Sequence, residues 1–103
     1  MTKDYLSELM TRGYIDEELI VAEVKNLMDN ENYVLCVSGV IVTLADALTP
    51  QKIFSDSTDR LYNVNVKSGL FKKQISFEYN NKHYIFVVKG GKKLVEYFGM
   101  IKY

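Results

Sequence analysis

The chain has 103 residues, of which 48% are apolar and 25% are charged, with no net charge at pH 7. This composition is typical of a globular domain and argues against a disordered or disulfide-stapled chain, so we expect a single domain over residues 1–103. The only cysteine, Cys36, lies in an apolar run and is expected to be a buried, inert thiol.

No segment approaches the ~20 consecutive apolar residues of a membrane span. The N-terminal residues also lack the apolar core and cleavage site of a signal peptide. We therefore predict a cytoplasmic protein with no integral membrane contact. Its abundance of Lys, Asn, Ile and Tyr suits a bacterial or phage source.

Two short helices are expected within residues 1–31, where they would form a helical hairpin. The first covers residues 2–12 and ends at Gly13, a residue that readily adopts the left-handed conformation of a helix stop. Asp16 can cap the second helix. Its apolar residues recur at helical spacing: Ile20, Val24, Leu27 and Met28.

Strand signals begin after Asn32. Residues 33–43 are rich in β-branched residues and predict a mostly buried strand with a bend at Gly39, whereas residues 44–52 are left open, with one helical turn at 44–48. Five further strand-like runs follow: Ile53-Phe54, Leu61–Val66, Gln74–Tyr79, His83–Val88 and Leu94–Phe98. Hairpin turns are expected at Asn80-Asn81 and Gly90-Gly91, because both pairs accept a positive φ.

The predicted fold class is therefore α+β. Two N-terminal helices pack on an antiparallel, partly open sheet of four to six strands that spans residues 33–103.

Two neighbouring segments resemble a known family. Residues 58–62 read Thr-Asp-Arg-Leu-Tyr, and residues 68–73 read Ser-Gly-Leu-Phe-Lys-Lys. Together they are similar to a hairpin of small bacterial pleckstrin-homology-like domains. The resemblance implies a partly open sheet that binds lipids, peptides or other copies of itself and has no catalytic activity. The chain departs from that family in its expected N-terminal helices and in ending on a strand where the family has a helix.

Candidate catalytic and metal-binding residues are scarce. His83 is the only histidine and has no partner at a defining spacing, so a structural or solvent-facing role is favoured. Residues 90–93 read Gly-Gly-Lys-Lys but lack the spacing of a phosphate-binding loop, and no helix is expected after them. Asp56, Asp59 and Glu78 do not form a calcium-loop pattern. We predict that the protein is not an enzyme and has no cofactor and no metal.

Charge is divided along the chain. Residues 1–50 carry three basic and nine acidic residues, whereas residues 51–103 carry ten basic and four acidic residues. Lysines near turns are also ordinary devices for solubility and for protecting sheet edges. The functional alternative is an anion-binding surface near the hairpin ends, for which the candidates are Lys67, Lys72, Lys73, Lys82, Lys89, Lys92 and Lys93.

The C-terminal run is expected to be an edge strand with apolar residues on both faces. Only Glu96 and Lys102 add charge to this edge, so it is thinly protected against pairing with another strand. It is the predicted interface of a homodimer or of a complex with another protein. The interface candidates are Leu94, Val95, Tyr97, Phe98, Met100 and Tyr103.

The leading functional hypothesis is a non-catalytic protein-interaction module, such as a small regulator or inhibitor. Eight tyrosines support it, because tyrosine is enriched at protein interfaces. The alternative is a binder of nucleic acid or anionic lipid through the lysine-rich sheet surface. An isoelectric point of 6.6 and the absence of a recognisable nucleic-acid-binding motif weigh against this alternative.

Overall fold

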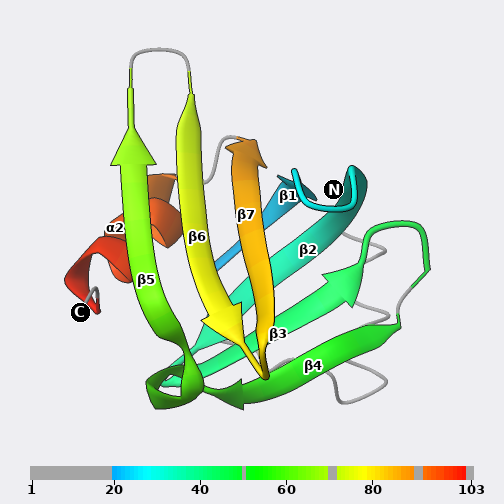
Figure 1. The fold of residues 1–103 in the computed structure, drawn as a ribbon, viewed down its shortest axis with the longest axis horizontal. Helices are drawn as coiled ribbons and strands as arrows, with labels where there is room; N and C mark the ends of the chain where they lie inside the picture. Colours follow the sequence, from blue (N-terminus) through cyan, green and yellow to red (C-terminus); the bar gives the residue numbers. More distant parts are fainter. Residues whose placement is uncertain (1–19, 50, 70–71, 90–91, 102–103) are drawn as a thin grey trace.

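The fold is a seven-stranded antiparallel sheet that curls around one C-terminal helix (Figure 1). The computed structural model describes residues 20–49, 51–69, 72–89 and 92–101. Within them the elements are β1 (Ile20–Asn26), β2 (Glu31–Ser38), β3 (Ile41–Asp46), β4 (Lys52–Ser57), the 3₁₀-helix η1 (Thr58–Arg60), β5 (Tyr62–Ser68), β6 (Lys73–Tyr79), β7 (Lys82–Lys89) and α2 (Lys92–Met100).

The strand order is β4-β3-β2-β1-β7-β6-β5, so β1 lies at the centre and β4 and β5 lie at the two edges. The four strands β1 to β4 form one meander and β5 to β7 form another. Pairing of β1 with β7 joins the two meanders. This half-barrel with a C-terminal helix is compatible with the pleckstrin-homology-like fold that the sequence resembles.

The predicted α+β class with N-terminal helices is wrong for the described residues. The segment assigned to the second helix is β1, in which every second side chain is buried: Ala22, Val24 and Asn26. Ile20, Val21 and Val24 are β-branched and fit a strand better than a helix. Pairing on both sides, with β2 and β7, decides the conformation. The first predicted helix, residues 2–12, lies outside the described residues.

The strand predicted over residues 33–43 is in fact two strands. Gly39 has a φ of +61°, a left-handed conformation that glycine adopts at no steric cost, and it turns β2 back into β3. As a result, residues 44–46 belong to β3 and do not form a helical turn. Part of the predicted segment is buried as expected: Val34 to Val37 in β2, and Val42 and Thr43 in β3.

The hairpin of β6 and β7 confirms its prediction. Tyr79 pairs with Lys82, and Asn80 and Asn81 have φ values of +52° and +66°, as a two-residue type I′ turn requires. The next residue pair away from the turn is Glu78 with His83. The sequence therefore predicted the turn of this hairpin and the two strands that it joins.

The C-terminal segment is a helix, which corrects the prediction of a sixth strand-like run at residues 94–98. Its buried residues Leu94, Val95 and Phe98 and the partly buried Ile101 recur at i, i+1, i+4 and i+7. That spacing places them on one face of a helix, and the face packs on the concave side of the sheet. We also expected no helix after the Gly-Gly-Lys-Lys sequence of residues 90–93, and this expectation is wrong, because α2 begins at Lys92.

Aromatic side chains fill the concave side of the sheet. Phe77 lies at the centre, with ring centroids 5.6 Å from Tyr84, 5.7 Å from Phe86 and 5.9 Å from Phe98. Phe54 of β4 joins them at 6.4 Å from Phe77. Most of the phenylalanines therefore serve the core, which weakens the argument that the aromatic content signals an interface.

Phe98 and Met100 give a test of the helix. We expect Phe98→Ala to lower the free energy of unfolding by about 3–5 kcal/mol, because it opens a cavity against Phe77. Met100 is 80% exposed, so Met100→Ala should change stability by less than about 0.5 kcal/mol. Urea denaturation of both variants measures the difference. Equal effects would contradict the packing of α2 described above.

Candidate functional site

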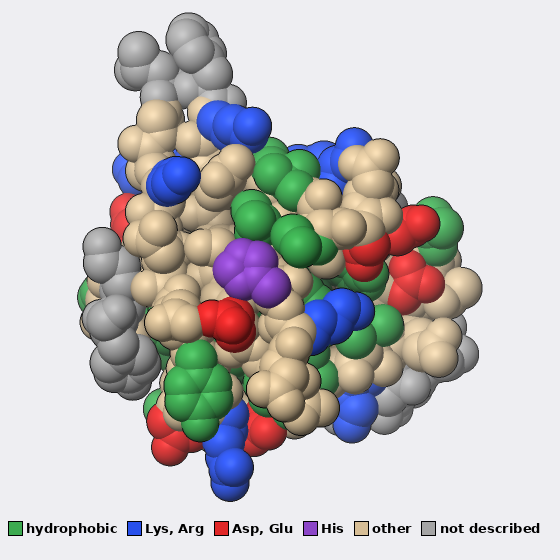
Figure 2. Space-filling view, viewed as in Figure 1, with side chains coloured by type: hydrophobic (Ala, Val, Ile, Leu, Met, Phe, Trp, Pro, Cys, Tyr) green, Lys and Arg blue, Asp and Glu red, His purple; other side chains and the backbone are tan. Residues whose placement is uncertain are grey.

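Six of the seven predicted anion-binding lysines lie at one end of the molecule. We call this set the lysine end: Lys67, Lys72, Lys73, Lys89, Lys92 and Lys93. Figures 1 and 2 show that β5, β6 and β7 meet at this end and that basic side chains lie over it. The seventh, Lys82, lies at the opposite end of β7, with its amine 5.3 Å from the centre of the Tyr84 ring.

Strand register brings these lysines together. Ser68 pairs with Lys73, and the backbone N–H of Gly69 donates to the carbonyl of Lys72 at 2.8 Å, so the hairpin of β5 and β6 ends here. Lys89 ends β7, which runs antiparallel to β6 and therefore finishes beside the start of β6. Helix α2 begins three residues later, at Lys92.

The electrostatics of the lysine end favour an anion. Lys92 and Lys93 occupy the first turn of α2, which contains no acidic residue. The amino end of a helix already carries partial positive charge, so lysines placed there raise the local potential further. Glu23 pairs with Lys89 across β1 and β7, and Glu96 lies on the exposed side of α2. Acidic residues are thus present but outnumbered.

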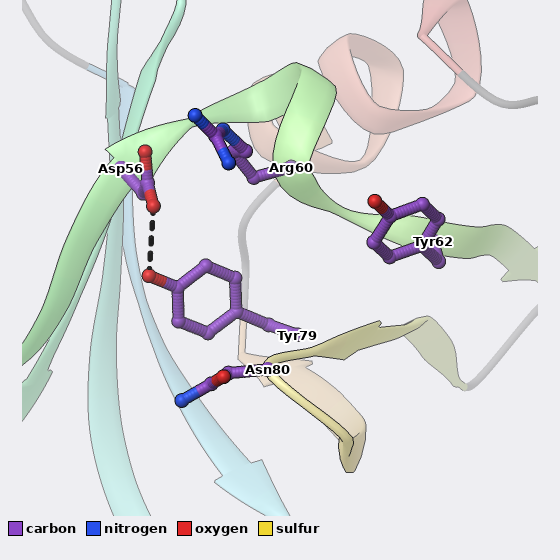
Figure 3. Close-up of a pocket in the computed structure, with 5 residues that line it drawn as sticks. All are labelled: Asp56, Arg60, Tyr62, Tyr79 and Asn80. Atoms are coloured by element: carbon purple, nitrogen blue, oxygen red, sulfur yellow. Dashed lines mark hydrogen bonds between the residues drawn. The ribbon is translucent and has the colours of Figure 1, made fainter.

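A second candidate site is a pocket of about 320 Å³ at the other end of β5. We call it the seam pocket, because it lies where the edge strands β4 and β5 approach each other around η1. Its lining residues are Asp56, Arg60, Tyr62, Tyr79 and Asn80 (Figure 3). They come from the end of β4, η1, the start of β5, and the turn between β6 and β7.

One hydrogen bond crosses the seam. The hydroxyl of Tyr79 donates to Asp56 Oδ2 at 2.8 Å, and the Tyr79 ring stacks on Phe54 with centroids 4.1 Å apart. The N–H of Ser57 donates to Asp56 Oδ1 at 2.7 Å. The Ser57 and Tyr79 bonds, with a smaller contribution from the Arg60 charge, lower the pKa of Asp56. The bond to Asp56 in turn raises the pKa of Tyr79.

The groups that line the seam pocket differ in how they are already engaged. Both oxygens of Asp56 accept hydrogen bonds, from the N–H of Ser57 and the hydroxyl of Tyr79. Tyr62 is 64% exposed and offers an aromatic face, while Arg60 and Asn80 offer hydrogen-bond donors. Such a set can contact a polar or aromatic side chain of a partner.

The seam pocket and the lysine end lie at the two ends of β5. This strand forms one edge of the sheet, and within the described ranges no strand pairs with its outer side. Asn63 has a φ of +53°, and the register with β6 shifts between Tyr62 and Asn65. From Asn65 to Ser68 the pairing is regular. The outer edge of β5 is therefore irregular near the pocket and regular near the lysines.

The predicted C-terminal interface does not have the expected geometry. Leu94, Val95 and Phe98 are buried in the core, where a partner strand cannot reach them. Tyr97 is partly buried, and its hydroxyl donates to the carbonyl of Gly39 at 3.0 Å. Met100 is exposed, and Tyr103 lies outside the described residues. The expected edge strand is absent from residues 92–101, whereas a role of this segment in dimerisation stays a prediction.

His83 and Cys36 occupy different environments. His83 is exposed near the middle of the face shown in Figure 2. Cys36 is buried in β2, and burial raises the pKa of its thiol to about 12. Nowhere in the described segments do three or more histidine, cysteine, aspartate or glutamate side chains come together as metal ligands.

The comparisons with known proteins give no relative. No family matches the chain, and neither the curated proteins nor the solved structures contain a significant match. Among the described elements, no helix has the length and apolar character needed to cross a membrane. The candidate sites therefore rest on the geometry of this chain alone.

Sequence reasoning missed the seam pocket. Asp56 was considered only as a metal ligand, and Arg60 and Tyr62 only as part of the family resemblance. Their proximity to Tyr79 depends on the curl of the sheet, which no local pattern reveals. The one available signal was the cluster of polar residues between two short strands, which is typical of a corner.

The hydrogen bonds to Asp56 predict a pH dependence of stability. In the folded state they hold the pKa of this carboxyl below its ordinary value of 3.8. Their stabilisation is therefore full above that value and is lost as the pH falls through the lowered pKa. We expect the free energy of unfolding to fall less steeply below about pH 4 in Asp56→Asn than in the unaltered protein. Urea denaturation at a series of pH values measures this, and superimposable slopes would count against the role of Asp56.

The burial of Cys36 predicts an unreactive thiol. The thiolate is the reactive species, and burial suppresses its formation. An aromatic disulfide reagent at about pH 8 should therefore modify the folded protein only as fast as the structure opens and exposes Cys36. The urea-unfolded chain should react at once. Rapid modification of the folded protein would show that β2 is accessible in solution.

Proposed function

We propose that this protein is a non-catalytic interaction module that binds an acidic surface of another protein at the lysine end. The observation that carries the proposal is the convergence of six lysines from β5, β6, β7 and α2 on one end of the molecule. A scatter of lysines for solubility alone would not require four separate elements to bring them to one end of the molecule. The resemblance to pleckstrin-homology-like domains, which act by binding, adds support.

A protein partner is favoured over a membrane by the positions of the exposed apolar side chains. Leu27 and Met28 lie in the turn between β1 and β2, beside Asp29, and Leu48 lies in the loop after Asp46. These apolar tips are therefore accompanied by carboxylates, which an anionic membrane repels.

The alternative is that the lysine end binds nucleic acid or anionic lipid. The same convergence of lysines favours it, because a phosphate-rich partner is attracted by clustered positive charge. The described part of the lysine end contains no arginine and no exposed aromatic ring, the groups that usually stack on bases. This alternative therefore ranks second.

Charge replacement tests the proposal. We expect Lys72→Gln with Lys73→Gln to elute from immobilised polyglutamate at a lower salt concentration than the unaltered protein, because two screened contacts are lost. The matched control is Lys52→Gln with Lys82→Gln, which removes the same charge elsewhere and should elute close to the unaltered protein.

The same proteins are then passed over heparin and over vesicles containing phosphatidylserine. Retention on polyglutamate with little retention on the other two supports a protein partner. Stronger retention on heparin or vesicles would favour the alternative. Equal elution of the two double variants would remove the lysine end as the binding site.

A further inference from the structure

We infer that the partner's acidic segment binds in an extended conformation, as an added strand along the outer edge of β5, with which no strand of the described residues pairs. This inference rests on the proposed function, because it takes the lysine end as the site and specifies how the partner occupies it. The occupant is a stretch of alternating acidic and neutral residues in another protein. Two observations, the position of β5 in the sheet and the charge at its end, support it independently.

The first observation is the exposed edge itself. Outside the β5–β6 ladder, the backbone groups of Asn65 to Ser68 have no strand partner in the described residues. Proteins usually protect such an edge with charge, proline or a bulge. In β5 the bulge lies at the start, around Asn63, and within the regular part only Lys67 adds charge. The regular half of the edge is thus open to pairing.

The second observation is charge complementarity along that half. Side chains of an added strand alternate between the two faces of the sheet, about 7 Å apart on the same face. Lys67 lies on the same face of the sheet as Gln74, its partner in β6, whereas Lys73 pairs with Ser68 and lies on the opposite face. Carboxylates at every second position of an added strand would share the face of Lys67. A segment without negative charge would place no opposite charge beside Lys67.

The other edge of the sheet is less suitable. β4 carries the acidic Asp56 near its end, and its pairing with β3 is interrupted between Leu44 and Ala45. An acidic segment added there would meet the carboxylate of Asp56, which repels it. The charge of the partner therefore selects β5 over β4.

Two peptides of equal charge test the inference on the full chain. One alternates glutamate and threonine over eight residues, and the other alternates glutamate and proline; both are capped at each end and carry a fluorescent label. Proline removes backbone N–H donors and fixes φ near −65°, so the second peptide keeps the charge but cannot form a regular strand. We expect the proline peptide to bind at least about tenfold more weakly in fluorescence anisotropy.

Hydrogen exchange locates the contact. Amides of residues 65–68 should exchange more slowly with the glutamate–threonine peptide bound, whereas those of residues 52–57 in β4 should not change. Equal affinity of the two peptides, or protection confined to β4, would overturn strand addition at β5.

The Lys72→Gln and Lys73→Gln double variant separates this inference from the proposed function. One outcome is that both peptides bind the unaltered protein with equal affinity and that the double variant weakens both equally. The lysine end then binds acidic proteins without strand addition. If neither peptide binds the unaltered protein, the proposed function and this inference fail together.

Discussion

Closure of the curled sheet by aromatic side chains is the constraint on which the rest of the structure depends. β4 and β6 are far apart in strand order, yet Phe54 stacks on Tyr79 with ring centroids 4.1 Å apart. Phe77 then connects this contact to Phe86 and to Phe98 of the helix. These contacts keep the two ends of the curled sheet together, because each ring buries a large apolar area and packs at a favourable distance from its neighbours.

The same closure positions both candidate sites. Where β4 turns through η1 into β5, it brings Asp56 within hydrogen-bond distance of Tyr79 and forms the seam pocket. β5 then runs from this pocket to the end where β6 begins and β7 finishes. An edge strand thus connects a polar pocket to a basic end.

Buried Asn26 shows how the two meanders are joined. It is the last residue of β1, and its side-chain oxygen accepts from the N–H groups of Met28 and Ile85, each at 3.2 Å. The N–H of Leu27 donates to the carbonyl of Ile85 at 2.7 Å. At the point where the pairing of β1 with β7 ends, the Asn26 side chain thereby replaces a backbone hydrogen bond between the strands. An apolar residue at this position would leave the N–H groups of Met28 and Ile85 without this acceptor.

The sequence by itself determined the β6–β7 hairpin, because its signals are local: neither the Asn80-Asn81 turn nor the alternation of Ile75, Phe77 and Tyr79 depends on distant residues. It also indicated the lysines, although not their convergence. Only the tertiary structure decided the conformation of β1 and α2, because the apolar residues of both segments fit the spacing of a helix as well as that of a strand. Strand partners on both sides extend β1, whereas the concave face left open by the curled sheet accepts residues 92–100 as a helix with a single apolar side.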